Sequence, residues 1–121
     1  MTNEQTLFER LGGAEGCAAI AELVVENHLK NPDINKRFLD SDPAALKVLV
    51  RTFFAAGTGG PNEYEGRDMV TAHTGMNLNE REFVSTIDDV LAAIDERGLD
   101  AGVRSEVLAI LYSFKDDILF R

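Results

Sequence analysis

The stretch Gly59–Gly75 contains the side chain with the clearest capacity for chemistry. It reads GGPNEYEGRDMVTAHTG, and His73, one of two histidines in the chain, lies in it among Met69, Val70 and Met76. An imidazole nitrogen can donate a lone pair to a metal, and in apolar surroundings it can hold a flat, apolar metal cofactor by a single axial bond. A histidine on a short helix can also have a purely structural role, and spacing alone leaves both interpretations open.

The segment before this stretch would supply the apolar surroundings. Apolar residues recur at helical spacing from about Pro43 to Gly57, and they predict a helix with one continuous apolar face. Asp42 is suited to cap this helix, and proline is favoured at a first helical position. The residues of the apolar face are Leu46, Leu49, Val50, Phe53, Phe54 and Gly57.

The stretch FFAAGTGGPNEYEGRDMVTAH resembles the truncated haemoglobins, in particular group I of that family. It has a phenylalanine pair ending a helix, a GGP-x-x-Y-x-G loop, a methionine, and then Ala-His. The match extends from Leu7 through Phe38 to Phe83, and more loosely to the C-terminal helix. The resemblance implies haem b as the cofactor and His73 as the proximal ligand of its iron. It also implies a globin-like fold, the truncated two-over-two helical sandwich.

The same resemblance implies further contacts with the haem. Phe38 is expected to stack on the porphyrin, whereas for the other matching residues ordinary core packing is the alternative. These others are Leu46, Leu49, Val50, Phe54, Tyr64, Met69 and Phe83. Candidates for holding the propionates are Lys47, Arg51, Arg67 and Tyr64, although long cations on a helix surface are usually only solvated.

On the distal side of the haem, the sequence departs from the family pattern. Group I members usually place a tyrosine on the second helix and polar residues such as glutamine on the next, where they hydrogen-bond bound oxygen. The matching positions here are Val25, Leu46, Leu49 and Val50, none of which carries a donor. Such a hydrogen bond contributes about 1.5–3 kcal/mol. Its loss should weaken oxygen retention by about one to two orders of magnitude.

His28 is the polar residue that could complete this distal pocket, which we expect to contain Val25, Leu46, Val50 and Phe53. It lies three residues beyond Val25, on nearly the same face of its helix. It could donate to a bound ligand or coordinate the iron as a second axial ligand. The alternative is a histidine at the solvent edge, near the rim of the haem.

The remaining periodicity predicts an all-α chain. A capping-box pattern at Thr6–Glu9 opens a very short helix, and a tight helical turn is expected at 33–39. The other helices are expected at 14–30, 80–97 and 101–119, the last as one continuous helix. The resemblance pairs 14–30 with 43–57 and 80–97 with 101–119. A four-helix bundle without cofactor is the alternative, but it leaves the position of His73 unexplained.

Composition narrows the function classes. With 121 residues, we expect one domain spanning 1–121. The net charge of −9 argues against nucleic acid or an anionic membrane as a partner. A single cysteine, Cys17, cannot form an internal disulfide and suits a reducing compartment. The first residues show no secretion signal, and no apolar run is long enough to span a membrane. We therefore expect a cytoplasmic monomer.

The resulting hypothesis is a haem protein that reversibly binds diatomic gases (oxygen, nitric oxide or carbon monoxide) for transport, storage or sensing. An enzymatic alternative is nitric oxide dioxygenation, which needs a separate reductase because no flavin or nicotinamide motif is evident. Weak peroxidase activity is another alternative, with His28 as its one candidate acid–base group. We assign no catalytic residue. A haem-free helical interaction module is the remaining class.

Overall fold

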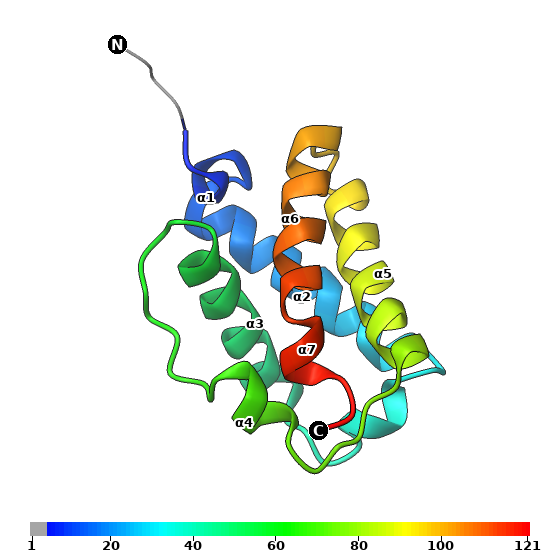
Figure 1. Cartoon of the computed structure of the whole chain (residues 1–121). Helices are drawn as coiled ribbons and strands as arrows, with labels where there is room; N and C mark the ends of the chain where they lie inside the picture. The colour runs from blue at the N-terminus through cyan, green and yellow to red at the C-terminus, as the bar shows by residue number, and fades with distance from the viewer. Residues whose placement is uncertain (1–4) are drawn as a thin grey trace.

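The computed structural model describes residues 5–121, which form a helical fold (Figure 1). Its two longest helices, α2 (Gly13–Lys30) and α5 (Glu80–Glu96), lie against each other. α5 and α6 lie side by side, and α2 passes behind them. The elements are α1 (Leu7–Arg10), α2 (Gly13–Lys30), η1 (Asn35–Phe38), α3 (Pro43–Gly57), α4 (Met69–His73), α5 (Glu80–Glu96), α6 (Ala101–Ser113) and α7 (Lys115–Ile118). Within the described part there is no strand, only an isolated bridge between Leu78 and Leu119. The all-α prediction is confirmed.

Most helices begin where the sequence provides a capping side chain. Thr6 and Asn79 each form a complete capping box with the glutamate three residues later, at the starts of α1 and α5. Asp42 accepts a hydrogen bond from the Ala44 amide, and Pro43 occupies the first position of α3, as predicted. The bounds of α2, α3 and α5 agree with the predicted ones to within one residue.

α2 runs through the centre of the core. Its residues Cys17, Ile20 and Val24 are almost completely buried and pack with side chains from α3, α5 and α6. Burial raises the pKa of the Cys17 thiol, which keeps it in the unreactive protonated form. A second, smaller cluster joins α5 to the C-terminal segment, and its members are Phe83, Ile87, Leu91 and Leu119.

The expected continuous helix at 101–119 is wrong. α6 ends at Ser113, Phe114 has φ −88° and ψ 1°, and α7 is a separate turn. The break turns the Phe114 ring toward Phe53, with ring centroids 5.7 Å apart. It also directs the chain end toward Leu78, whose carbonyl accepts a hydrogen bond from the Phe120 amide at 2.9 Å. Neither glycine nor proline marks this position, so tertiary packing decides it.

The loop between α3 and α4 is tied to α1. The Phe8 amide donates to the Thr58 carbonyl at 2.8 Å, and a Cβ at Gly60 would collide with the Phe8 ring. The Tyr64 hydroxyl then donates to the Arg67 carbonyl at 2.7 Å, just before α4. These contacts fix both ends of the loop and so position α4. In the described part of the chain, no helix is long and apolar enough to cross a membrane.

Gly16 provides a test of the close approach between α1 and α2. A Cβ at Gly16 would collide with the Leu11 carbonyl, whereas a Cβ at the exposed Gly57 would meet nothing. We expect Gly16→Ala to lower the free energy of unfolding by about 1–3 kcal/mol. Gly57→Ala should leave it unchanged or raise it by about 0.5–1 kcal/mol. Urea denaturation of the two variants measures both, and equal stabilities would contradict this packing.

Candidate functional site

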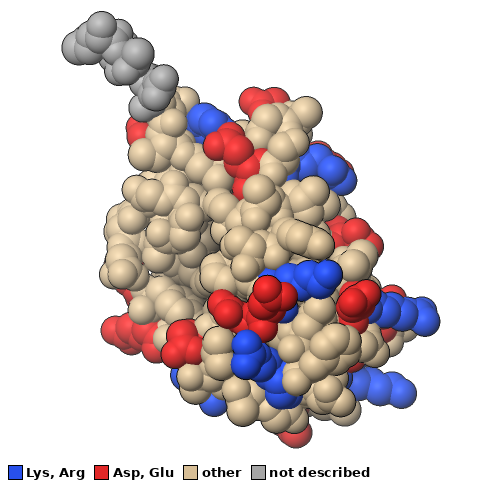
Figure 2. Space-filling model, viewed as in Figure 1, with Lys and Arg blue, Asp and Glu red and all other residues tan. Residues whose placement is uncertain are grey.

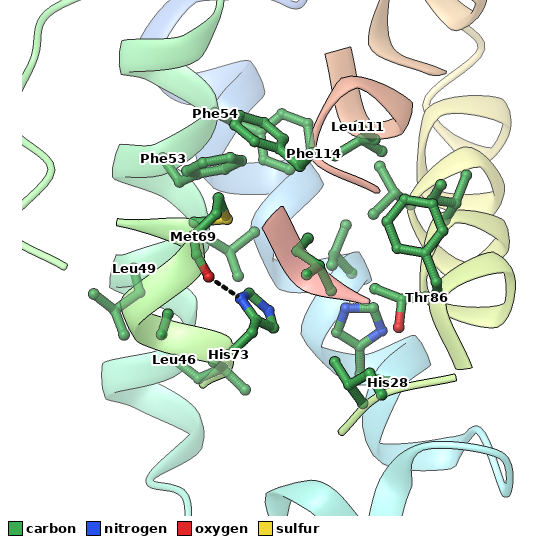
Figure 3. Close-up of a pocket in the computed structure, with 18 of the residues that line it drawn as sticks. His28, Leu46, Leu49, Phe53, Phe54, Met69, His73, Thr86, Leu111 and Phe114 are labelled. Atoms are coloured by element: carbon green, nitrogen blue, oxygen red, sulfur yellow. Dashed lines mark hydrogen bonds between the residues drawn. The ribbon is translucent and has the colours of Figure 1, made fainter. Parts of the chain in front are cut away.

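A cavity of about 280 Å³ lies between α2, α3, α4, α5 and the C-terminal helices (Figure 3). Its volume is close to the lower end of the range for ligand pockets, and most of its lining is apolar. Ten of the residues singled out in the sequence line it: His28, Leu46, Leu49, Val50, Phe53, Phe54, Tyr64, Met69, His73 and Phe83. On the face shown in Figure 2, the surface is hollowed, and the charged side chains lie around the hollow rather than inside it.

His73 enters the cavity from α4. The carboxylate of Asp68 begins this helix by accepting hydrogen bonds from the Thr71 amide at 2.8 Å and the Thr71 hydroxyl at 3.1 Å. The Nδ1 of His73 lies 2.7 Å from the Met69 carbonyl oxygen (Figure 3). Because a carbonyl oxygen can only accept, Nδ1 carries the proton and Nε2 keeps its lone pair. Nε2 points into the cavity, so the site presents one oriented nitrogen ligand.

α3 forms the apolar wall that its periodicity predicts. Leu46, Leu49 and Phe53 project from it into the cavity (Figure 3). The buried hydroxyl of Thr52 on the same helix donates to the Val48 carbonyl at 2.8 Å and does not line the cavity. The α3 side chains that line the cavity therefore offer no hydrogen-bond donor to a bound ligand.

Two of the residues expected to contact the haem or to form the distal pocket do not line the cavity. Val25 is completely buried, and its neighbour Val24 lines the cavity instead, because adjacent helical residues point about 100° apart. The ring of Phe38 stacks on that of His28, with centroids 5.6 Å apart and planes within 5°. Phe38 thus contacts the site through His28.

His28 belongs to a partly buried polar network that sequence reasoning missed. Its Nδ1 lies 2.7 Å from Asp89 Oδ2, and Asn31 donates to the same oxygen at 3.0 Å. Asn31 also donates to Ser85 Oγ at 2.8 Å, and that hydroxyl donates to Asp33 at 3.1 Å. Asp89 lies on α5, 61 residues from His28, and no local pattern links the two positions.

The environment of His28 favours the neutral imidazole. Only 6% of the residue is exposed, and burial lowers its pKa below the ordinary value. The hydrogen bond and the charge of Asp89 raise the pKa, but they do not cancel the effect of burial. Because a carboxylate accepts, Nδ1–H donates to Asp89, and the neutral ring then keeps its lone pair on Nε2.

Other lining residues carried no sequence signal for this site. Phe114 and Ile118 reach the cavity because the chain breaks between α6 and α7. Thr86 lines the cavity from α5, and its hydroxyl donates to the Glu82 carbonyl at 2.9 Å. The other such residues are Val24, Ala72, Leu78, Ile87, Val90 and Leu111. Their apolar spacing indicated a core position and did not distinguish the core from a cavity wall.

Among the four candidates for holding an anionic group near the cavity, two are already engaged. Lys47 is paired with Glu22 at 2.7 Å, and the Tyr64 hydroxyl donates to the Arg67 carbonyl. Arg51 is half-buried on α3, and the side chain of Arg67 is exposed. Of the four candidates, Arg51 and Arg67 therefore remain for binding an anionic group near the cavity. This role stays a prediction.

Substitution of Asp89 tests the buried pair. We expect Asp89→Asn to lower the pKa of His28 further, because the carboxylate's charge and hydrogen bond both raise it. Nuclear magnetic resonance titration of the His28 Cε1 proton measures this shift. The matched control is Asp88→Asn on the exposed side of α5, which should change the pKa little. A higher pKa in Asp89→Asn would contradict the assigned pairing.

Comparisons with known proteins agree with this geometry. The chain matches the family model described as Bacterial-like globin over residues 6–120. It is 29% identical over 119 residues to a Group 1 truncated hemoglobin of Tetrahymena pyriformis, covering 98% of both chains. It is 30% identical over 109 residues to a Group 1 truncated hemoglobin of Synechocystis, covering 87% of this chain and 88% of that one.

Solved structures extend the likeness to three dimensions. The crystal structure of the Tetrahymena pyriformis truncated hemoglobin in its Fe(III) form superposes with a TM-score of 0.93 at 29% identity, covering 97% of this chain and 100% of that one. Related structures of that protein carry a tyrosine changed to phenylalanine or one of two glutamines changed to glutamate. The 2/2 hemoglobin of Synechococcus superposes with a TM-score of 0.88 at 24% identity, covering 95% of this chain and 98% of that one. The predicted two-over-two fold is confirmed.

Proposed function

Because this chain belongs to the bacterial-like globins and, within them, to the group 1 truncated haemoglobins, we propose that His73 holds its haem and that the iron binds diatomic gases reversibly. Haem is the cofactor of this family, and the binding of a small gas at its iron is the family's general activity. The assignment of His73 and the character of the distal pocket rest on the geometry described above.

The residues present fit a haem. The single oriented lone pair of His73 Nε2 is suited to one axial bond to iron, and its Nδ1–H···O=C hydrogen bond is the outer contact that usually orients a metal-bound histidine. The cavity around it is lined mainly by aliphatic and aromatic side chains, which a porphyrin ring can contact on both faces. When bound, the iron supplies the open coordination position for the gas. The residues that line the cavity would fix the orientation of the haem and exclude water from the space around it.

The distal wall supports reversible binding with weak oxygen retention. Leu46, Leu49 and Val50 line the cavity from α3 and offer no donor to bound oxygen. Carbon monoxide carries little charge when bound, so an apolar wall penalises it far less than oxygen. Oxygen is therefore expected to leave quickly, whereas carbon monoxide is retained.

Nitric oxide dioxygenation remains an alternative to binding alone. The apolar wall would admit nitric oxide, but the reaction begins from a stable oxygen complex, which the same wall disfavours. It would also need a separate reductase. Rapid mixing of the oxygen-bound protein with nitric oxide distinguishes the two functions, because fast nitrate formation would favour the enzyme. We also propose a cytoplasmic monomer, because a single cysteine cannot form an internal disulfide and the buried Cys17 is not exposed for one between copies.

Replacement of His73 tests the proposed axial bond. We expect His73→Gly protein to lose the Soret and visible bands of a histidine-ligated haem, and added imidazole should restore them. The matched control is Thr74→Gly, which introduces glycine at the exposed end of the same helix and should keep the wild-type spectrum. Absorption spectra of the ferric and ferrous forms of both variants measure this difference. An unchanged axial signature in His73→Gly would overturn the assignment.

A donor introduced on α3 tests the oxygen prediction. Leu46→Gln should slow oxygen dissociation about 10- to 100-fold, because an amide donor stabilises partly charged bound oxygen by about 1.5–3 kcal/mol. Leu46→Met, similar in size but without a donor, should leave the rate nearly unchanged. Stopped-flow measurement of oxygen dissociation provides the comparison, with carbon monoxide as the ligand that should respond little. Equal oxygen rates in the two variants would show that another residue already supplies a donor.

A further inference from the structure

We propose that His28 is a proton acceptor for small neutral weak acids, written H–X, which enter the apolar cavity and bind ferric haem iron as the anion X⁻. Hydrogen sulfide, hydrogen cyanide and hydrazoic acid have this chemistry. This inference deepens the proposed function and rests on it, because it requires haem held by His73. What it adds is the residue that takes up the ligand's proton, a step that oxygen, nitric oxide and carbon monoxide do not require.

The orientation of His28 leaves one ring nitrogen available. Nδ1 donates to Asp89, and Nε2 has no hydrogen-bond partner among residues 5–121. Within the same residues, no fully buried side-chain nitrogen or oxygen lacks a partner. Nε2 is therefore not enclosed by protein atoms, and because His28 lines the cavity, we infer that this nitrogen opens onto it. Figure 3 shows the rings of His28 and His73 entering the cavity from α2 and α4, on opposite sides.

The other polar side chains of the cavity are already committed. The Thr86 hydroxyl donates to the Glu82 carbonyl, and the Tyr64 hydroxyl donates to the Arg67 carbonyl. The Nε2 of His73 is the proposed iron ligand. Among the described residues that line the cavity, His28 is thus the one base that could accept a proton from a ligand.

Within the network around His28, Asp89 favours the imidazolium that proton uptake would create and opposes the effect of burial. The Asp89 carboxylate receives hydrogen bonds from His28 and from Asn31, which hold it in place. With His28 neutral, this buried pair has a net negative charge, and after protonation it becomes a neutral ion pair. Asp33 is the next acid, three hydrogen bonds from Asp89 through Asn31 and Ser85. Stacking on the Phe38 ring keeps the imidazole from turning away.

The cations on the neighbouring elements are directed elsewhere. Arg37 of η1 donates to both carboxylate oxygens of Glu82, and Lys36 beside it is exposed. Lys47 of α3 is paired with Glu22. The wall that α3 presents to the cavity is apolar. The charge that shifts the pKa of His28 is that of the Asp89 carboxylate, which raises it.

The proton balance is simple. The H–X bond breaks, its electron pair stays on X, and the proton moves to His28 Nε2. No electron is transferred and no further reactant is needed. A bound metal cation makes such a ligand much more acidic, so a neutral imidazole is a sufficient base. The neutral acid enters an apolar cavity more readily than its anion does, because burying an unpaired charge is costly. The proton must therefore be released inside, where His28 can receive it.

The test compares ligands with and without a proton. The ferric protein is mixed rapidly with sodium sulfide and with sodium azide across a range of pH, and the ferrous protein is mixed with carbon monoxide. In His28→Leu, the ratio of the sulfide or azide association rate to that of carbon monoxide should fall about 100-fold, the usual scale of acid–base assistance. The wild-type pH profile should contain an inflection that His28→Leu lacks. Asp88→Asn, on the exposed side of α5, should keep the wild-type ratio and profile.

Two further measurements keep the proposal falsifiable if His28→Leu folds poorly. The first is the same rate ratio in His28→Gln, a polar replacement that cannot accept the proton in this way. The second is calorimetry of cyanide binding near neutral pH, where the free ligand is the neutral acid, in buffers of different ionisation enthalpy. The wild-type protein should release fewer protons to the buffer than His28→Gln, because His28 holds part of the ligand's proton. Nitrogen-15 chemical shifts of His28 in the ferrous, carbon monoxide-bound protein should show Nδ1 protonated and Nε2 bare.

The outcomes separate this inference from the proposed function. An unchanged rate ratio in both His28 variants overturns the proton-acceptor role while carbon monoxide binding still supports a gas-binding haem protein. A wild-type ferric spectrum of two histidine ligands that disappears in His28→Leu also overturns it, because His28 would then coordinate the iron itself. Absence of a haem spectrum and of carbon monoxide binding overturns the proposed function, and this inference with it.

Discussion

The site depends most on the hydrogen bond between His73 Nδ1 and the Met69 carbonyl. It is 2.7 Å long, it lies within one turn of α4, and it determines which ring nitrogen keeps a lone pair. Asp68 begins that turn by capping it, and the loop before it is anchored to α1 through the Phe8 amide. A five-residue helix has little stability of its own. The position of the proposed iron ligand is therefore set by its cap, by the anchored loop and by the cavity wall.

The two histidines of the chain are oriented by the same principle and with different consequences. Each donates Nδ1–H to an oxygen acceptor, so each leaves Nε2 available toward the cavity. The acceptor of His73 is a neutral carbonyl, whereas that of His28 is the carboxylate of Asp89. A carboxylate can stabilise a positive imidazolium and a carbonyl does so much less. The first arrangement suits a permanent bond to a metal, and the second suits a nitrogen that gains and loses a proton.

Periodicity and capping patterns predicted the helices well because those signals are local. Asp42 and Thr6 cap the helices that they were expected to begin, and the apolar spacing of α3 produced the cavity wall. The break at Phe114 was not predictable, because it results from packing against Phe53 and from pairing of the chain end with Leu78. The contact between His28 and Asp89 was equally hidden, since it joins two helices far apart in sequence.

The free energy needed to bury the pair of His28 and Asp89 bears on the role of that pair. Burying a carboxylate and an imidazole costs more than burying apolar side chains of similar size, and such a pair often adds little net stability. α2 and α5 already pack through apolar residues such as Val24 and Val90, so the fold does not need a polar pair to join them. The pair nevertheless lies beside a cavity whose remaining wall is mostly apolar, with its free nitrogen available there. A network that contributes little to packing and opens onto the ligand space is better explained by what it does to the ligand.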